Sequence, residues 1–248
     1  MSSPALQGVI RSLRIYHGPH APRDAMDQLY RLFVEPGALV FDIGAHVGDR
    51  ISSFRRLGAR VIAVEPQPLL FSALNHIHGR DPLVELLDRA VGSDAGVREL
   101  FVNTTNPTVS TLSEEFVNQA RGARGWEDQI WDGRVPIEIV TLDGLIARYG
   151  TPSFIKIDVE GYEDAALRGL SQPVKALSFE FTTIARYVAM ACFDRLSALG
   201  RYRYNLALGE SQKLLFDVWM SDEEMAGHLS NLPHEANSGD VYATLALD

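Results

Sequence analysis

Acidic residues at the ends of apolar stretches are the side chains whose type and position first suggest chemistry. Asp42 ends "ALVFD", Glu65 ends "VIAVE", and Asp88 and Asp158 end "VELLD" and "FIKID". Short apolar runs of this kind are typical of buried parallel strands. Ligands of doubly wound sheets bind beyond the carboxyl ends of such strands. We therefore expect these carboxylates to meet at one edge of a sheet and to face a ligand there.

The turn after Asp42 narrows the choice of ligand. In "DIGAHVG", Gly44 and Gly48 follow the strand, but the middle glycine of the dinucleotide fingerprint is missing. Glu65 follows Asp42 by 23 positions, close to the interval at which an acid meets a ribose hydroxyl in adenosine binders. Asp42 would repel a diphosphate and attract an ammonium group. S-adenosylmethionine has an ammonium, a sulfonium and a ribose but no phosphate, so the motif favours it over NAD, although the turn alone also suits simple close packing.

A second acidic motif suggests where an acceptor would react. Asp158 and Glu160 lie two apart at a strand end, which places both side chains on one side of an extended segment. A hydroxyl accepts a methyl group poorly unless its proton is taken up as the bond forms. We expect Asp158 to border the cofactor and the acceptor, and Glu160 or Glu180 to hold or deprotonate the acceptor. For Glu163 a favourable charge at a helix N-terminus is the preferred explanation.

The histidines and the single cysteine give no comparable motif. His46 could approach the cofactor as a base, although a backbone contribution is the preferred interpretation. His17 and His20 have ligand-like spacing without a further partner nearby, so no metal site is expected. Cys192 is the only cysteine and excludes an intrachain disulfide.

The elements that must position these residues alternate between strand and helix patterns. The alternation predicts an α/β fold with a doubly wound, mostly parallel sheet and antiparallel pairing at its C-terminal edge. Val84 to Gly92 is expected to form the third strand. Residues 104–136 form a long irregular segment in which Trp126 and Trp131 either stack on a sugar or anchor the loop to the core. We expect residues 1–22 to be an N-terminal segment that could cover the cofactor, and residues 23–248 to be a single domain.

Composition excludes several other classes of protein. The chain has 248 residues, of which 46% are hydrophobic and 22% charged, and its net charge is −9. This charge argues against a surface that neutralises phosphates, so no nucleic-acid partner is expected. No apolar run reaches the length of a membrane span. The N-terminus lacks the pattern of a secretory signal, and we expect a cytoplasmic location.

Four segments, taken in order, resemble the FkbM-type methyltransferases. They are "VFDIGAHVGDR", "VIAVEPQP", "STL" at 110–112 and "FIKIDVEGYEDAALRGL". The resemblance covers about residues 38–181 and implies a class I, Rossmann-like fold with S-adenosylmethionine-dependent O-methylation of a sugar, glycan or secondary-metabolite hydroxyl. Family members often carry Asn where this chain has His46. The resemblance implies cofactor contacts at Asp42, Gly44, Ala45, His46, Gly48, Glu65, Pro66, Asp158 and, around the adenine, Asp88, Ala90 and Val91.

Two alternative functions remain at this point. One is an NAD-dependent oxidoreductase, which the acid at Asp42 and the missing glycine disfavour. The other is a protein of the same fold that binds S-adenosylmethionine without catalysis. The expected partner of the enzyme is a small molecule or glycan that carries a hydroxyl group.

Overall fold

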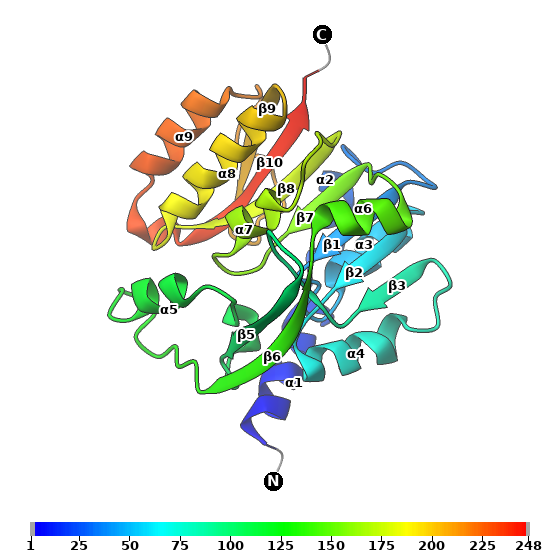
Figure 1. The fold of residues 1–248 in the computed structure, drawn as a ribbon, viewed down its shortest axis with the longest axis vertical. Helices are drawn as coiled ribbons and strands as arrows, with labels where there is room; N and C mark the ends of the chain where they lie inside the picture. Colours follow the sequence, from blue (N-terminus) through cyan, green and yellow to red (C-terminus); the bar gives the residue numbers. More distant parts are fainter. Residues whose placement is uncertain (1–2, 247–248) are drawn as a thin grey trace.

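The computed structural model describes residues 3–246, in which strands and helices alternate over much of the chain (Figure 1). The helices are α1 (Pro4–Tyr16), α2 (Arg23–Tyr30), α3 (Asp49–Arg56), α4 (Pro68–His78), α5 (Glu114–Ala120), α6 (Leu142–Tyr149), α7 (Glu163–Arg168), α8 (Arg186–Leu199) and α9 (Asp222–Asn231), with short 3-10 turns at Pro107–Val109 and His234–Ala236. The strands are β1 (Leu39–Ile43), β2 (Arg60–Val64), β3 (Val84–Leu87), β4 (Ala90–Val91), β5 (Gly96–Val102), β6 (Gly133–Val140), β7 (Phe154–Ile157), β8 (Ala176–Thr182), β9 (Tyr202–Leu208) and β10 (Ser238–Leu245).

The main sheet confirms the predicted fold class. Its seven strands have the order β3-β2-β1-β7-β8-β10-β9. In this sheet β3, β2, β1, β7 and β8 run parallel, and β10 pairs antiparallel with both β8 and β9. The chain moves outward from β1 to β3 and later returns to β7 on the other side of β1. The carboxyl ends of β1 and β7 therefore flank the switch point, where doubly wound sheets bind ligands.

The third predicted strand is the main difference from the sequence-based expectation. Val84 to Gly92 does not form one strand, because β3 ends at Leu87 and β4 belongs to a second sheet with the order β4-β6-β5. Between them, Asp88 is exposed and forms an ion pair with Arg89. The partner of β4 is β6, about fifty residues later, and this pairing cannot be read from the local pattern.

Helices cover both faces of the main sheet because alternate residues of each strand point to opposite sides. On one face, Phe154 and Tyr242 stack with Phe33, next to α2 and α3. On the other face, Ile155 and Val241 belong to a core that includes α6, α7, α8 and α9. Figure 1 shows α8 and α9 side by side next to β9 and β10. The two cores hold the carboxyl ends of the strands in fixed positions.

The N-terminal helix packs against the domain. Val9 of α1 is buried and clusters with Val47 and Leu70. Ser3 caps the helix by accepting a hydrogen bond from the amide of Leu6. These contacts bring the end of α1 next to the turn that follows β1.

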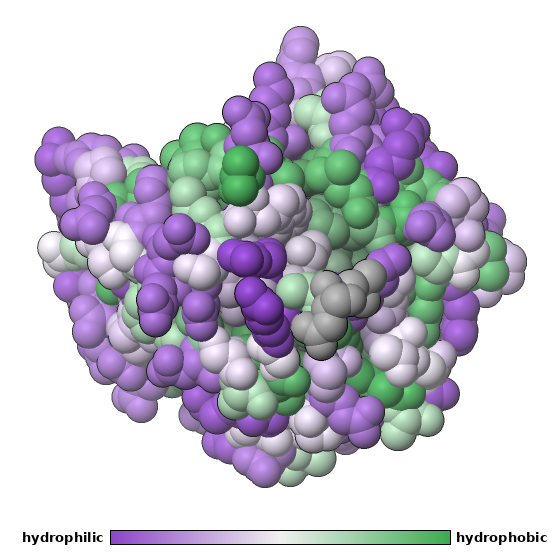
Figure 2. Space-filling model, turned by 90° about the horizontal axis from the view of Figure 1, so that it is seen from above, coloured by the Kyte–Doolittle hydropathy of each residue, from purple (hydrophilic) through white to green (hydrophobic). Residues whose placement is uncertain are grey.

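One face of the molecule carries both polar and apolar regions. Figure 2 shows one end of the molecule, where hydrophobic side chains gather between projecting hydrophilic parts. Within residues 3–246, no helix is long and apolar enough to cross a membrane.

Candidate functional site

A cavity of about 380 Å³ lies at the carboxyl ends of the strands around the switch point. This volume is within the range of small-molecule sites. The predicted site residues that line the cavity are Gly44, Ala45, His46, Glu65, Pro66, Ala90, Val91, Asp158, Glu160 and Glu180. Asp42, Gly48 and Asp88 do not line it. The structure thus brings most of the sequence-predicted residues together around one space.

The turn after β1 is held tightly against two neighbouring strands. Gly44 has φ +83°, and a Cβ added there would lie 1.8 Å from the carbonyl oxygen of Asp158. The amides of Gly44 and Ala45 donate to the carbonyl oxygen of Val64 at 2.9 and 3.0 Å. Only glycine tolerates both the positive φ and the close approach. The first predicted motif is therefore a turn that fixes the ends of β1, β2 and β7 relative to one another.

His46 contributes its backbone to this arrangement. Its amide donates to Glu65 Oε2 at 2.9 Å, and its ring packs edge-on against Tyr16. Burial lowers the pKa of His46 to about 4, so the ring is neutral at pH 7.

Asp42 lies behind the cavity wall. Its side chain is 0% exposed, and neither carboxylate oxygen has a hydrogen-bond partner within residues 3–246. Burial raises the pKa of Asp42 to about 7. Asp42 is paired in register with Lys156 of β7, so the two side chains share a face of the sheet. The predicted acids that line the cavity are instead Glu65, Asp158, Glu160 and Glu180, and Asp49 and Glu210 line it as well.

Gly48 and Asp88 also lie outside the cavity lining. Gly48 has φ +82°, and a Cβ there would meet His78 Nε2 at 2.7 Å. This glycine therefore permits close packing of α4 against the turn. Asp88 is exposed beside Arg89, whereas the neighbouring Ala90 and Val91 are buried and offer an apolar wall.

Glu65 is fixed at the end of β2. Its side chain is 3% exposed and accepts hydrogen bonds from the amides of His46 and Gln67 at 2.9 and 2.8 Å. Burial outweighs these hydrogen bonds and raises the pKa of Glu65 to about 8. The carboxyl group is held rigidly at the position where an acid is expected to meet a ribose.

Asp158, Glu160 and Glu180 form an acidic cluster at the other side of the cavity. Each provides one oxygen that lies within 4.8 Å of the other two. Burial and then repulsion from Asp158 raise the pKa of Glu160, and burial and then repulsion from Glu160 raise the pKa of Glu180. Burial would also raise the pKa of Asp158, but Lys156 Nζ lies 2.6 Å from Asp158 Oδ2 and lowers it. The cluster thus contains one paired and two unpaired carboxyl groups.

Glu163 organises the turn that carries this cluster. Its Oε1 accepts hydrogen bonds from the amides of Val159 and Gly161 at 3.0 and 3.2 Å. Glu163 is the first residue of α7, as the helix N-terminal explanation requires, but its side chain is buried and binds the preceding loop.

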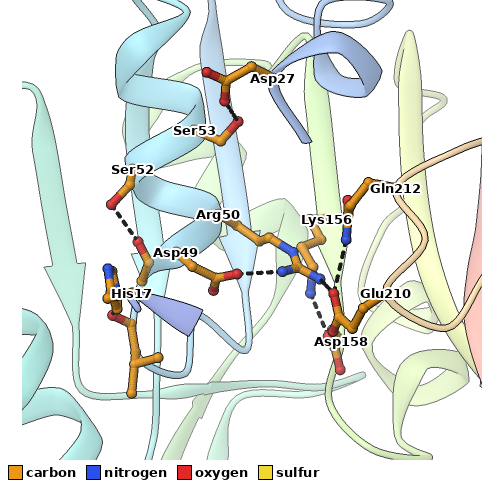
Figure 3. Close-up of polar contacts among 12 residues, drawn as sticks. His17, Asp27, Asp49, Arg50, Ser52, Ser53, Lys156, Asp158, Glu210 and Gln212 are labelled. Atoms are coloured by element: carbon orange, nitrogen blue, oxygen red, sulfur yellow. Dashed lines mark hydrogen bonds and ion pairs between the residues drawn. The ribbon is translucent and has the colours of Figure 1, made fainter. Parts of the chain in front are cut away.

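Several charged residues around the cavity were not predicted from the sequence (Figure 3). Arg50 forms ion pairs with Asp49 and with Glu210, the latter at 2.8 Å, and Lys156 pairs with Asp158. The sequence could have indicated Lys156, because this residue is a lone charge in the apolar run "FIKI". The sequence could not have indicated the pairing of Arg50 with Glu210, since the two residues lie 160 positions apart.

Comparison with known proteins assigns the family. Residues 42–229 match the family described as the methyltransferase FkbM domain. The chain belongs to the FkbM methyltransferase family. Membership of this family implies S-adenosylmethionine, rather than NAD, as the cofactor.

Two similar proteins add detail about the FkbM chain. It is 25% identical over 152 residues to the hexuronic acid methyltransferase AglP of Haloferax volcanii, a match that covers 60% of this chain and 57% of AglP. The chain therefore aligns with little more than half of that relative. The TehB-like S-adenosylmethionine-dependent methyltransferase of Corynebacterium glutamicum superposes with a TM-score of 0.51 at 11% identity, covering 98% of this chain and 100% of that one. This likeness supports the class I methyltransferase fold.

In this FkbM domain the long segment before β6 closes one side of the cavity. It contains α5, and its last predicted residues, 133–136, belong to β6. Trp126 lines the cavity and packs edge-on against Phe116 at 5.4 Å. Trp131 Nε1 donates to the carbonyl oxygen of Val109 at 2.8 Å. Trp131 therefore anchors the loop, whereas Trp126 both anchors it and faces the cavity.

Proposed function

We propose that the protein transfers a methyl group from S-adenosylmethionine to a hydroxyl group of a sugar, a glycan or a related secondary metabolite. The observation that carries this proposal is the pair of unpaired carboxyl groups, Glu160 and Glu180, next to Asp158 in the cavity. A hydroxyl acceptor needs a nearby group that takes its proton.

The residues of the cavity fit the cofactor. Glu65 is positioned for the ribose hydroxyls, and Ala90 and Val91 offer apolar contact to the adenine. The backbone of Gly44 and Ala45 would hold the methionine part, with Asp158 close to its positive charges. Because S-adenosylmethionine carries no phosphate, the cavity does not need a site that binds a diphosphate. These assignments make Glu65 and Gly44 the most informative positions for cofactor-binding experiments.

The chemistry required of the protein is limited, because the bound cofactor supplies an already activated methyl group. The chain has to align the acceptor oxygen and exclude water. Glu160 or Glu180 accepts the proton from the acceptor, and a raised pKa makes each carboxylate a stronger base. Asp158, kept ionised by Lys156, orients the acceptor.

A neutral, sugar-like acceptor suits the cavity better than an anionic group. Three carboxyl groups at one end would repel a carboxylate. Trp126 offers an aromatic face of the kind on which sugar rings pack. AglP, the similar protein of Haloferax volcanii, is named for a hexuronic acid, which carries hydroxyl groups as well as a carboxylate.

Kinetics of methyl transfer to a panel of sugars, uronic acids and phenols test this proposal. We expect Glu160→Gln and Glu180→Gln each to lower kcat at least tenfold while the KM for S-adenosylmethionine changes little. Glu99→Gln is the matched control, because Glu99 is exposed on β5 and does not line the cavity. Tight cofactor binding without transfer to any acceptor would instead support the non-catalytic alternative.

A further inference from the structure

We propose that Asp158, Glu160 and Glu180 bind a divalent cation, Mg²⁺ or Mn²⁺, beside the cofactor. This inference departs from the expectation of no metal site. The role of the cation in orienting the acceptor rests on the proposed function, whereas the binding site itself does not.

The three side chains converge from different parts of the fold. Asp158 follows β7, Glu160 lies in the turn before α7, and Glu180 lies within β8. One oxygen of each lies within 4.8 Å of the others. Mg²⁺ binds oxygen ligands at about 2.0–2.1 Å, so ligands on opposite sides of one ion are separated by about 4 Å and adjacent ligands are closer, which the three side chains reach with small movements. Carboxylate oxygens are the ligands that Mg²⁺ and Mn²⁺ prefer.

The unsatisfied carboxyl groups are the second, independent observation. Glu160 is 7% exposed and lines the cavity, and within residues 3–246 its carboxylate has neither a hydrogen bond nor an ion pair. Glu180 Oε2 is buried and also has no hydrogen-bond partner in that part of the chain. An unpaired buried carboxylate is costly. A cation is the partner that both groups lack.

Two other buried glutamates show how this fold satisfies acids with a structural role. Glu65 and Glu163 each accept two backbone hydrogen bonds. Glu160 and Glu180 have no such donors, although they lie in the same region. The contrast indicates that their carboxylates are left available for a ligand.

The cations already present do not neutralise the cluster. Lys156 pairs with Asp158, and Arg50 is engaged by Asp49 and Glu210. Carboxyl groups bind a cation in their ionised form, and the three ionised carboxylates with Lys156 carry a charge of about −2, which one divalent cation balances. Three protein ligands, each bound through one oxygen, leave coordination positions open for water or an acceptor hydroxyl, whose proton a bound cation makes easier to remove. The second carboxylate oxygen of Glu160 or Glu180 is then the group that accepts this proton.

Binding of Mn²⁺, followed by electron paramagnetic resonance of the chelator-treated full chain, tests the site without any activity assay. We expect one Mn²⁺ per chain, displaced by Mg²⁺. Glu160→Gln and Glu180→Gln should each weaken Mn²⁺ binding at least tenfold, and Glu99→Gln, which removes a remote exposed acid, should leave it unchanged. Thermal unfolding of each variant verifies that it is folded.

The results separate the metal site from the proposed function. The site is refuted if wild-type protein binds no stoichiometric Mn²⁺, or if both glutamine variants bind it as tightly as wild type. Methyl transfer that persists at full rate in excess chelator would overturn a role for the cation and leave the proposed function standing. Stoichiometric Mn²⁺ binding that depends on Glu160 and Glu180, without transfer to any hydroxyl acceptor, would support the site and overturn the proposed function.

Discussion

At the scale of single residues, the acids near the cavity differ in what satisfies them. Backbone amides hold Glu65, and Lys156 pairs with Asp158. Asp42 and Glu160 have no partner of either kind among residues 3–246. The sequence pattern predicted that acids gather at the strand ends. Position at a strand end does not reveal whether the side chain faces the ligand or is buried away from it, and Asp42 is buried away from the cavity.

Glu65→Gln is expected to weaken binding of S-adenosylmethionine at least tenfold. An amide group keeps the shape but cannot accept hydrogen bonds with both of its terminal atoms, so either the turn at His46 or the ribose loses a partner. Isothermal titration calorimetry with the cofactor measures the effect, and Glu99→Gln serves as the control. Unchanged affinity would show that Glu65 does not contact the ribose.

Asp42→Asn is expected to stabilise the protein at high pH relative to wild type. The pKa of Asp42 is about 7 in the folded state against 3.8 as its ordinary value, so the folded state binds the proton more tightly. Its favourable contribution is complete below about pH 4 and is lost as the pH rises towards 7. Each pKa unit corresponds to about 1.4 kcal/mol. Ionisation of Asp42 at pH 8 therefore lowers the free energy of unfolding by up to about 4 kcal/mol relative to pH 4.

Urea unfolding at pH 5 and pH 8 measures this difference. The gain of Asp42→Asn over wild type should be larger at pH 8 than at pH 5. Asp128→Asn, a change at an exposed aspartate, should show no such dependence. An equal difference at both pH values would contradict the raised pKa of Asp42.

At the scale of elements, turns decide the geometry of the site. Strands β1, β2 and β7 were predicted because each is a short, mainly apolar run next to an acid, with Lys156 as the one charge within β7. The short strand β4 and the position of β10 between β8 and β9 depend on pairing with distant segments. A local sequence pattern does not predict such pairing, and it did not predict the ion pair of Arg50 with Glu210.

Gly44→Ala is expected to abolish cofactor binding or folding, whereas Gly37→Ala should be much milder. Both glycines have φ +83°, but a Cβ at Gly44 would meet the Asp158 carbonyl at 1.8 Å, and a Cβ at Gly37 meets nothing within 4 Å. The pair separates the clash from the cost of a positive φ, which is about 1–2 kcal/mol. Thermal unfolding and calorimetry distinguish them, and equal effects would refute the close approach of the two strand ends.

At the scale of the whole molecule, segments far apart in sequence enclose the cavity. Tyr16 at the end of α1 and Trp126 of the long segment before β6 both line it. Val9 anchors α1 by packing against Val47 and Leu70. The covering of the cofactor by the N-terminal segment stays a prediction, and the place of Tyr16 in the cavity wall makes it testable.

Val9→Asp is expected to release α1 and to weaken cofactor binding several-fold, while the main core stays folded. A buried charge would disrupt the contact of α1 with Leu70. Ile15→Asp on the same helix is the matched control, because Ile15 is 58% exposed. Calorimetry gives the affinity and limited proteolysis reports release of the helix. Equal affinity of both variants would argue against a covering role for α1.

The most direct test of the proposed function is the product formed from S-adenosylmethionine labelled with ¹³C in its methyl group. The acceptors are neutral sugars and hexuronic acids, and NMR of the product identifies the atom that carries the label. We predict a methyl ether on a hydroxyl group, formed at least tenfold more slowly by Glu160→Gln. A methyl ester on a carboxylate, or no transfer to any acceptor, would contradict the proposal.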